Sequence, residues 1–360
     1  MRKILVLFLP IILALTLASC SGSTEGDLKI FNAGEYIDEE LITAFEKRYG
    51  ASVSYVTFDS NETAITKMKS EYFDLVIPSD YAIEQLKMSN MIKPIDWSRI
   101  EGFTKEDLAE PVLEITEKLK NEEDGWDMLE YSVPYFFGKV GITYDANIVD
   151  YEDVKAGWSL LHNEKYRNKV AYYDSSRDGF MAAYKELGYS MNSTSLQETE
   201  EAFEWIKKIR QTTNCAFKTD ELLSEMPDGK YAISLMYSGD AIYSMMEQND
   251  NIDLQFYAPE SGTNVFIDAM VMPSNCRNED LAYKFISFML EAENAKANSI
   301  YVGYTTPVAS VYEELVQEGE EFYDYKDYYH VTINENDEVF RYNAEMKVIL
   351  NDYWVKLKLS

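Results

Sequence analysis

Histidine, cysteine and basic residues are scarce in this chain of 360 residues, which has two histidines, three cysteines, and 33 lysines and arginines against 63 acids. No His-Glu-x-x-His motif and no Cys-x-x-Cys pair occurs, so zinc hydrolysis, a structural zinc site and thioredoxin-type chemistry lack support. The chain also lacks a Gly-x-Ser-x-Gly elbow and the glycine-rich motifs that hold nucleotide phosphates. These absences argue against several classes of enzyme, and we expect neither a metal ion nor a cofactor.

The formal net charge is −30 at pH 7, which argues against nucleic acids and anionic lipid headgroups as partners. A cleft lined with acids would instead concentrate a cation, although an acidic surface can also serve solubility alone. Tyrosine is frequent, with 28 residues against 17 phenylalanines and 5 tryptophans. Acids and tyrosines together suit a ligand with ammonium groups on an alkyl chain, because carboxylates pair with the ammonium groups and rings pack on the methylenes.

The first residues are typical of an export signal. Two basic residues precede an apolar stretch over 4–17, which is too short to span a membrane comfortably. The sequence Leu-Ala-Ser-Cys at 17–20 resembles the lipobox of bacterial lipoproteins, which implies cleavage before Cys20 and a diacylglycerol group on its sulfur. We therefore expect a signal peptide over 1–19, a lipid-anchored tether over 20–26, and an extracytoplasmic protein held at the membrane. A plain signal peptide followed by a chance cysteine is the alternative.

The length suggests two domains, and the apolar pattern predicts an α/β protein. Strands are expected at 28–32, 53–58, 73–77, 132–135, 170–173, 232–237 and 265–272, helices at 38–49, 63–71, 179–187, 199–211 and 280–298, and an amphipathic tail at 338–358. The strand that contains Pro134 is predicted to cross between the domains. Cys215 and Cys276 could form a disulfide in an exported protein, and the sequence leaves this open.

Seven short patterns carry a resemblance to a known family. They are FNAGEY at 31–36, SNET at 60–63, YFDLVIPSDY at 72–81, YSVPY at 131–135, YDSSRD at 173–178 with LGYS at 187–190, FID at 266–268 and VGYTTP at 302–307. In this order they resemble the bacterial polyamine (spermidine/putrescine) substrate-binding proteins of ABC transporters. Each pattern alone is weak, but together they cover nearly the whole chain after the tether.

The resemblance implies the two-lobed α/β fold of type II periplasmic binding proteins, in which hinge strands join the lobes and the ligand cleft lies between them. It implies one lobe formed by 27–133 and 267–312 and another formed by 134–266 and 313–360. It also implies a monomeric binding protein, not an enzyme, that captures spermidine and/or putrescine by closing its cleft. Such a protein delivers its ligand to an ABC permease, in a periplasmic space or at a Gram-positive surface.

The same resemblance implies a set of ligand-binding residues. They are Glu35, Tyr36, Ser79, Tyr81, Asp174, Ser175, Asp178, Thr219, Tyr237, Phe266, Asp268 and Tyr304. Asp268 interrupts an apolar strand and is expected to be the main anchor, because a carboxylate in a cleft gains strongly from a desolvated ammonium group. Glu35 and Asp178 are candidates for the terminal amines. The aromatic residues are expected to sandwich the alkyl chain, and Ser79 and Thr219 to add hydrogen bonds.

The chain departs from the family pattern at several positions. Ala33 and Gly34 stand where Trp and a hydroxyl residue are common, and Ser175 replaces a common Asp. Tyr237 and Phe266 stand where Trp is common, so an aromatic face remains but the strongest cation–π partner is absent. These differences leave open which polyamine is preferred.

Several neighbouring residues have alternative roles. Asp80 and Asp240 are candidates to replace lost contacts near the cleft. Asp174 could instead pair with Arg177 or cap the following helix. The family's late Gln contact falls near Phe340 and has no clear equivalent.

Three other functions stay open at this point. The same fold could bind another cationic solute, such as an opine, a cationic amino acid or ferric iron, for which Tyr328, Tyr329 and His330 form a loose candidate. With so many acids, a secreted hydrolase that uses a pair of carboxylates is a second alternative. A surface adhesin or sensor is a third.

Overall fold

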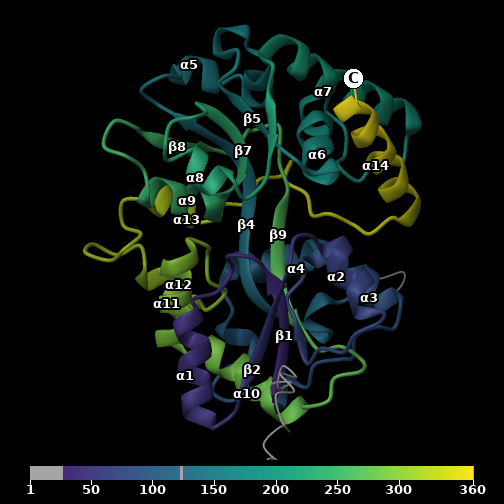
Figure 1. Cartoon of the computed structure of the whole chain (residues 1–360), viewed down its shortest axis with the longest axis vertical. Helices are drawn as coiled ribbons and strands as arrows, with labels where there is room; N and C mark the ends of the chain where they lie inside the picture. The colour runs from purple at the N-terminus through teal and green to yellow at the C-terminus, as the bar shows by residue number, and fades with distance from the viewer. Residues whose placement is uncertain (1–26, 122–124, 360) are drawn as a thin grey trace, which may run out of the picture.

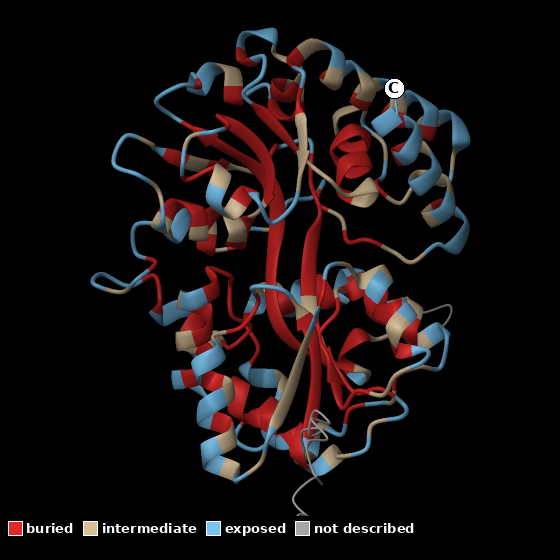
Figure 2. Cartoon of the chain, in the orientation of Figure 1, coloured by how far each residue is buried: buried red, intermediate tan, exposed pale blue. Residues whose placement is uncertain are grey.

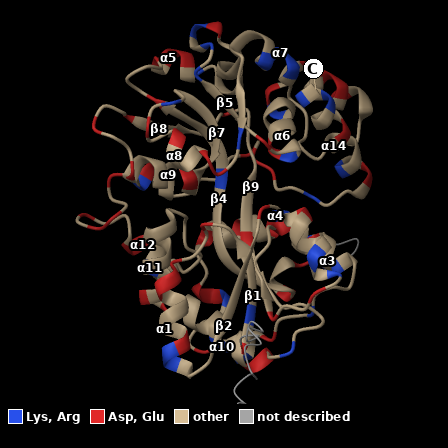
Figure 3. Cartoon of the chain, viewed as in Figure 1, with Lys and Arg blue, Asp and Glu red and all other residues tan. Residues whose placement is uncertain are grey.

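The computed structural model describes residues 27–121 and 125–359. The predicted signal peptide, Cys20 with its predicted lipid, and the tether at 20–26 lie outside the described residues. Among the described residues, no helix combines the length and the apolar character that a membrane span requires. The chain forms two lobes of mixed α/β structure, one above the other in Figure 1, and acidic residues lie on both (Figure 3).

The strands form one nine-stranded sheet in the order β2-β1-β3-β9-β4-β7-β5-β6, with β8 paired to β4. They are β1 (Leu28–Ala33), β2 (Val53–Phe58), β3 (Leu75–Val76), β4 (Ser132–Asp145), β5 (Val170–Tyr173), β6 (Ala216–Lys218), β7 (Ile233–Tyr237), β8 (Leu254–Tyr257) and β9 (Val265–Val271). We call the half with β1, β2 and β3 the first lobe and the half with β5 to β8 the second lobe. The β1 and β5 strands each pair in parallel with two neighbours, which is typical of strands that alternate with helices.

Two long strands, β4 and β9, join the lobes. They are antiparallel to each other, with a bulge between Pro134 and Phe136 that accommodates a residue without an N–H group. Every residue of β4 is buried, and Figure 2 shows both strands running through the buried centre of the molecule. The predicted crossing strand is therefore confirmed, and it continues beyond 135 to Asp145. The exact lobe boundaries stay a prediction.

Helices surround the sheet in each lobe (Figure 1). Those of the first lobe are α1 (Glu39–Tyr49), α2 (Asn61–Met68), α3 (Asp80–Met88), α4 (Glu110–Leu119), α10 (Glu279–Leu290), α11 (Ala292–Val302) and α12 (Ala309–Glu314). Those of the second lobe are α5 (Tyr151–Val154), α6 (Ser176–Glu186), α7 (Leu196–Thr213), α8 (Leu222–Glu225), α9 (Ser238–Met246), α13 (Lys326–Tyr329) and α14 (Ala344–Leu359). The α1 helix shows why these segments form helices: Asp38 caps its first turn, and Gly50 ends it at φ 63°.

Two expectations about local structure need correction. The single helix predicted over 280–298 is two helices, α10 and α11, because Glu291 adopts an extended ψ of 134° between them. The helix predicted over 63–71 begins at Asn61, since the side chain of Ser60 caps its first turn. Cys215 and Cys276 are free, so the disulfide that the sequence left open does not form.

Candidate ligand-binding cleft

A cavity of about 640 Å³ lies between the lobes, and all twelve residues predicted to bind ligand line it. The first lobe supplies Glu35, Tyr36, Ser79 and Tyr81, the strand β9 supplies Phe266 and Asp268, the second lobe supplies Asp174, Ser175, Asp178, Thr219 and Tyr237, and Tyr304 follows α11. Residues as distant in sequence as Glu35 and Tyr304 therefore converge on one cavity. That each of them binds ligand stays a prediction.

Most of these side chains follow the carboxyl ends of strands, where open α/β sheets bind their ligands. Tyr36 follows β1, Ser175 follows β5 and Tyr237 ends β7. Ser175 also caps α6, because its Oγ accepts a hydrogen bond from the backbone N–H of Asp178 at 3.4 Å. This cap turns the first residues of α6, including Asp178, toward the cavity.

Three carboxylates in the cavity each accept a hydrogen bond from a tyrosine hydroxyl. The pairs are Tyr36 Oη to Asp268 Oδ2 at 2.6 Å, Tyr304 Oη to Asp240 Oδ1 at 2.7 Å, and Tyr237 Oη to Asp178 Oδ2 at 3.1 Å. We call Asp178, Asp240 and Asp268 the acid cluster. Two of its members were predicted as ligand contacts, and the third, Asp240, was recognised only as a neighbour of the cleft.

Burial in the cavity raises the pKa of every member of the acid cluster, and that of Asp240 reaches about 7. Within the described ranges, no ion pair involves any of the three. Asp80 lies beside them, is 1% exposed, and has a pKa raised to about 8 by burial. Its carboxylate accepts the backbone N–H of Ile267 at 3.2 Å. A cation that enters this part of the cavity would therefore meet Asp240 and Asp268, which no basic group of the described chain balances, and Asp178, whose pKa Arg177 lowers without forming an ion pair.

Aromatic rings form a braced wall next to the acid cluster. The edge-to-face pairs are Tyr36 with Tyr304 at 4.9 Å, Tyr237 with Phe266 at 5.3 Å and Tyr173 with Tyr237 at 5.2 Å between ring centres. Each ring is thus braced by a favourable edge-to-face contact with its neighbour. Tyrosine and phenylalanine faces attract ammonium groups and pack on methylenes.

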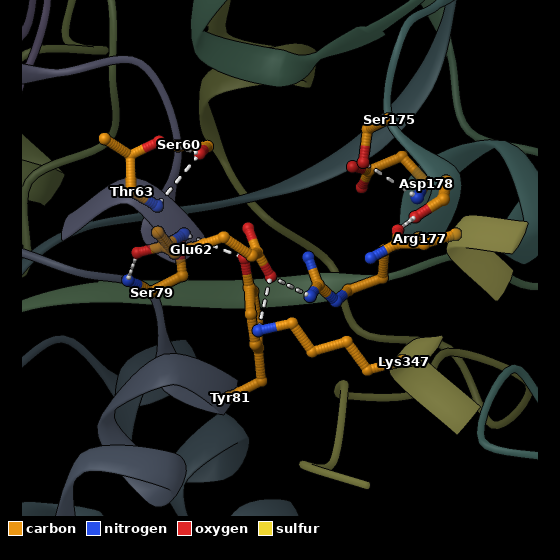
Figure 4. Close-up of polar contacts among 12 residues, drawn as sticks. Ser60, Glu62, Thr63, Ser79, Tyr81, Ser175, Arg177, Asp178 and Lys347 are labelled. Carbon is orange, nitrogen blue, oxygen red and sulfur yellow. Dashed lines mark hydrogen bonds and ion pairs between the residues drawn. The ribbon is translucent and has the colours of Figure 1, made fainter. Parts of the chain in front are cut away.

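A different part of the cavity holds a cation of the protein itself (Figure 4). The guanidinium carbon of Arg177 lies 3.5 Å from the centre of the Tyr81 ring, and its Nη2 donates to Oε1 of Glu62 at 2.8 Å. Lys347 Nζ lies 3.4 Å from the same oxygen. Figure 4 shows both basic side chains converging on Glu62 beside the Tyr81 ring. We call Arg177, Glu62 and Lys347 the arginine bridge.

The arginine bridge links the lobes, because Glu62 lies on α2 and its two partners lie on α6 and α14. Burial alone would raise the pKa of Glu62, but the two cations hold it below its usual value. One face of the Tyr81 ring is therefore covered by Arg177.

Some predicted contacts have partners within the protein. Asp174 accepts hydrogen bonds from Trp354 Nε1 at 2.9 Å and Lys358 Nζ at 2.6 Å, so its suggested pairing with Arg177 is wrong. It does not cap α6 either, since Ser175 does. Thr219 is exposed, and its hydroxyl donates to Glu221 at 3.2 Å. Glu35 is exposed on a turn at φ 50°.

Other residues line the cavity without having been predicted. Asn61 is one of them, and its Nδ2 donates to Ser79 Oγ at 3.0 Å and to Tyr81 Oη at 2.9 Å. It belongs to the SNET pattern, so the sequence did carry a signal for it. Tyr173 and Asn264 line the cavity as well. Tyr328, Tyr329 and His330 do not line it, so the loose iron candidate lies elsewhere.

Comparisons with known proteins agree with this architecture. The family described as bacterial extracellular solute-binding protein matches residues 40–345. The spermidine/putrescine-binding periplasmic protein of Salmonella typhimurium is 30% identical over 298 residues, which cover 82% of this chain and 81% of the relative.

Solved structures of similar proteins have the same fold. A putative spermidine/putrescine ABC transporter from Listeria monocytogenes is 32% identical with a TM-score of 0.78, and the match covers 92% of this chain and 98% of that one. The spermidine/putrescine ABC transporter substrate-binding protein PotD from Streptococcus pneumoniae is 32% identical with a TM-score of 0.72, over the same shares of the two chains.

Proposed function

Because this chain belongs to the bacterial extracellular solute-binding proteins, which bind solutes and are not enzymes, we propose that it is a polyamine-binding protein. It captures spermidine, putrescine or both in the cleft between its lobes. The names of relatives at about a third identity support this ligand class, as do the patterns that suggested it from the sequence.

The observation that carries the proposal is the acid cluster with its aromatic wall. Carboxylates in a poorly solvated cavity are costly without a cation, and no basic group of the described residues forms an ion pair with these three, although Arg177 acts on Asp178 through space. A polyamine brings several ammonium groups on an apolar chain, which match the carboxylates and the rings respectively. Among the described residues, no group of three or more histidine, cysteine or acidic residues is arranged to hold a metal ion. An organic cation therefore fits this cavity better.

Capture works through the equilibrium between open and closed lobes. The cavity takes residues from both lobes, such as Tyr36 from the first and Asp178 from the second. A ligand that touches both lobes binds the closed form more tightly, and this difference in affinity favours closure. No covalent bond forms or breaks.

The cellular setting follows from the amino-terminal sequence and the family. We propose that Cys20 carries a lipid, that the monomeric protein works outside the cytoplasmic membrane, and that it delivers its ligand to an ABC permease. Mass spectrometry of the purified protein from cells tests the lipid: an unmodified Cys20 would contradict the anchor.

Calorimetric titration with spermidine, putrescine and arginine tests the ligand class. We expect one-to-one binding of at least one polyamine, weak or no binding of arginine, and loss of polyamine binding in Asp268→Asn. No heat and no thermal shift with either polyamine would overturn the assignment. Tight binding of arginine alone would instead favour a cationic amino acid.

A further inference from the structure

Asn264 is a buried polar residue of the cavity wall that belongs to none of the seven sequence patterns. It is 2% exposed, and its amide oxygen has no hydrogen-bond partner among the described residues. The large majority of buried polar atoms in proteins are paired, because an unpaired one is unfavourable. The amide oxygen of Asn264 is therefore an acceptor that the folded chain leaves unused.

The position of Asn264 relates it to the predicted anchor. It directly precedes β9, and the alternation of side chains along an extended strand turns residues 264, 266 and 268 to the same face. Phe266 and Asp268 line the same cavity as Asn264. At a rise of about 3.3 Å per residue, the backbone at Asn264 lies about 13 Å along the strand from that at Asp268.

Asn264, Phe266 and Asp268 form a row along the strand, and the two ends of this row face different lobes. Asp268 pairs with Ser79 of the first lobe in an isolated bridge, whereas Asn264 pairs in the same way with Glu338, on the segment that leads into α14 of the second lobe. The row therefore presents a carboxylate, a ring and an amide in sequence from one lobe toward the other. An uncharged acceptor at the far end adds a hydrogen bond without adding another buried charge to the acid cluster.

We propose that the amide oxygen of Asn264 accepts a hydrogen bond from a ligand nitrogen that lies beyond the nitrogen held by Asp268. The inference rests on the proposed polyamine function and deepens it. The longer triamine extends further from Asp268 along this row than a short diamine does, so it gains more from an acceptor at Asn264. Asn264 thus favours spermidine over putrescine.

The test compares Asn264→Leu with the wild-type protein by calorimetry, using spermidine and putrescine separately. Leucine keeps the approximate size and removes the amide. We expect the dissociation constant for spermidine to rise about tenfold or more and that for putrescine to change less than threefold. Because the variant removes an unpaired polar atom, the melting temperature of the ligand-free protein should stay the same or rise. Asn264→Asp keeps an acceptor and should retain spermidine binding.

Asn294 provides a matched control. It is a buried asparagine outside the cavity, and its Nδ2 donates to the carbonyl of Phe288 at 2.8 Å. Asn294→Leu should lower the melting temperature and leave both affinities unchanged, which is the pattern of a structural asparagine. If Asn264→Leu does not fold, Asn264→Ala replaces it.

Three results would overturn the inference. Unchanged spermidine affinity in Asn264→Leu would show that the amide makes no contact. Equal weakening of both ligands, or a lowered melting temperature that Asn264→Asp does not restore, would assign Asn264 a structural role. If the wild-type protein binds neither polyamine, the proposed function fails, and this inference fails with it.

Discussion

Two groups of charged residues at the edge of and within the cavity differ in how their charge is balanced. In the arginine bridge, Glu62 contacts Arg177 at 2.8 Å and Lys347 at 3.4 Å. In the acid cluster, each carboxylate contacts a tyrosine hydroxyl and no cation of the described chain. The first group ties one lobe to the other, whereas the second lines the space between them.

This difference indicates which charges belong to the fold and which await a ligand. An acid paired with basic residues of its own chain has its pKa lowered, as Glu62 has, and needs nothing further. An acid buried without an ion pair has its pKa raised, as Asp178, Asp240 and Asp268 have, and for Asp178 burial outweighs the opposing effect of Arg177. Perturbed acids in a cleft are candidates for function, and here the direction of the perturbation separates the two groups.

Removing the anchor of the acid cluster should have the largest effect. Asp268→Asn should weaken polyamine binding on the order of 100-fold, since losing one partner of a desolvated charged contact costs about 2–5 kcal/mol. Calorimetric titration measures the loss. Asp174→Asn is the control, because Asp174 lines the same cavity but pairs with Lys358. The affinity of this variant for polyamines should change little. A larger loss in Asp174→Asn than in Asp268→Asn would reverse the comparison.

Changing the pH should have the next largest effect. The pKa of Asp240 is about 7, so raising the pH from 6 to 8 ionises it and should tighten polyamine binding about tenfold, while the ligand's amines remain charged. Asp240→Asn should flatten this dependence, which titrations at several pH values would reveal. A dependence unchanged in Asp240→Asn would mean that another group titrates.

The raised pKa values of buried acids also determine whether the stability of the ligand-free protein rises or falls with pH. Asp80 and Asp240 have folded-state pKa values of about 8 and about 7, above the ordinary value of 3.8. These two carboxyls therefore bind more protons in the folded protein than in the unfolded chain between about pH 4 and 8, and the stability that they contribute falls as the pH rises through this window. Thermal melts of the ligand-free protein from pH 5 to 8 check the sign, and a melting temperature that rises steadily would contradict it.

Removing one tyrosine hydroxyl should have a moderate effect. Tyr304→Phe keeps the ring but takes a hydrogen bond from Asp240, and a loss of about 1 kcal/mol predicts about fivefold weaker binding. Tyr329→Phe is the control, since its hydroxyl lies 2.9 Å from Ser299 Oγ and the residue does not line the cavity. We expect that control to melt at a lower temperature with unchanged affinity.

Breaking the arginine bridge should have the smallest effect on binding. Glu62→Gln removes a partly exposed ion pair, which contributes about 1 kcal/mol or less to stability. Spermidine and putrescine should both keep their affinities within about threefold, as measured by the same titrations. A loss as large as that of Asp268→Asn would place the arginine bridge in the binding machinery and end the distinction between the two groups.

Much of the fold could be predicted because it depends on local patterns. Local apolar patterns located β1, β2 and β5 to within one residue of their ends. The break between α10 and α11 was missed because Glu291 is an ordinary helix former, and its extended backbone is visible only in the structure. The antiparallel centre of the sheet was missed because pairing between β4 and β9 joins segments about 130 residues apart in the sequence.

The candidate site was predictable where motifs carry it and not elsewhere. Asp178, Phe266 and Asp268 belong to the patterns and do line the cavity. The partners of Asp174 lie on α14, some 180 residues later, and no spacing rule connects them. Asn264 had no sequence signal, because an asparagine with an unused amide looks like any other until its surroundings are known.

The sequence by itself determined the α/β class, the acidic charge, the aromatic and acidic residues that gather at the cavity, and the family patterns, because these depend on composition and on short-range order. Tertiary structure decided which acids receive a cation from the chain. Glu62 and Asp268 are both carboxylates in sequence patterns of the same kind, yet folding brings Arg177 to Glu62 and only tyrosine and serine hydroxyls to Asp268. That choice depends on long-range contacts between lobes, because desolvation and charge pairing act through space and not along the chain.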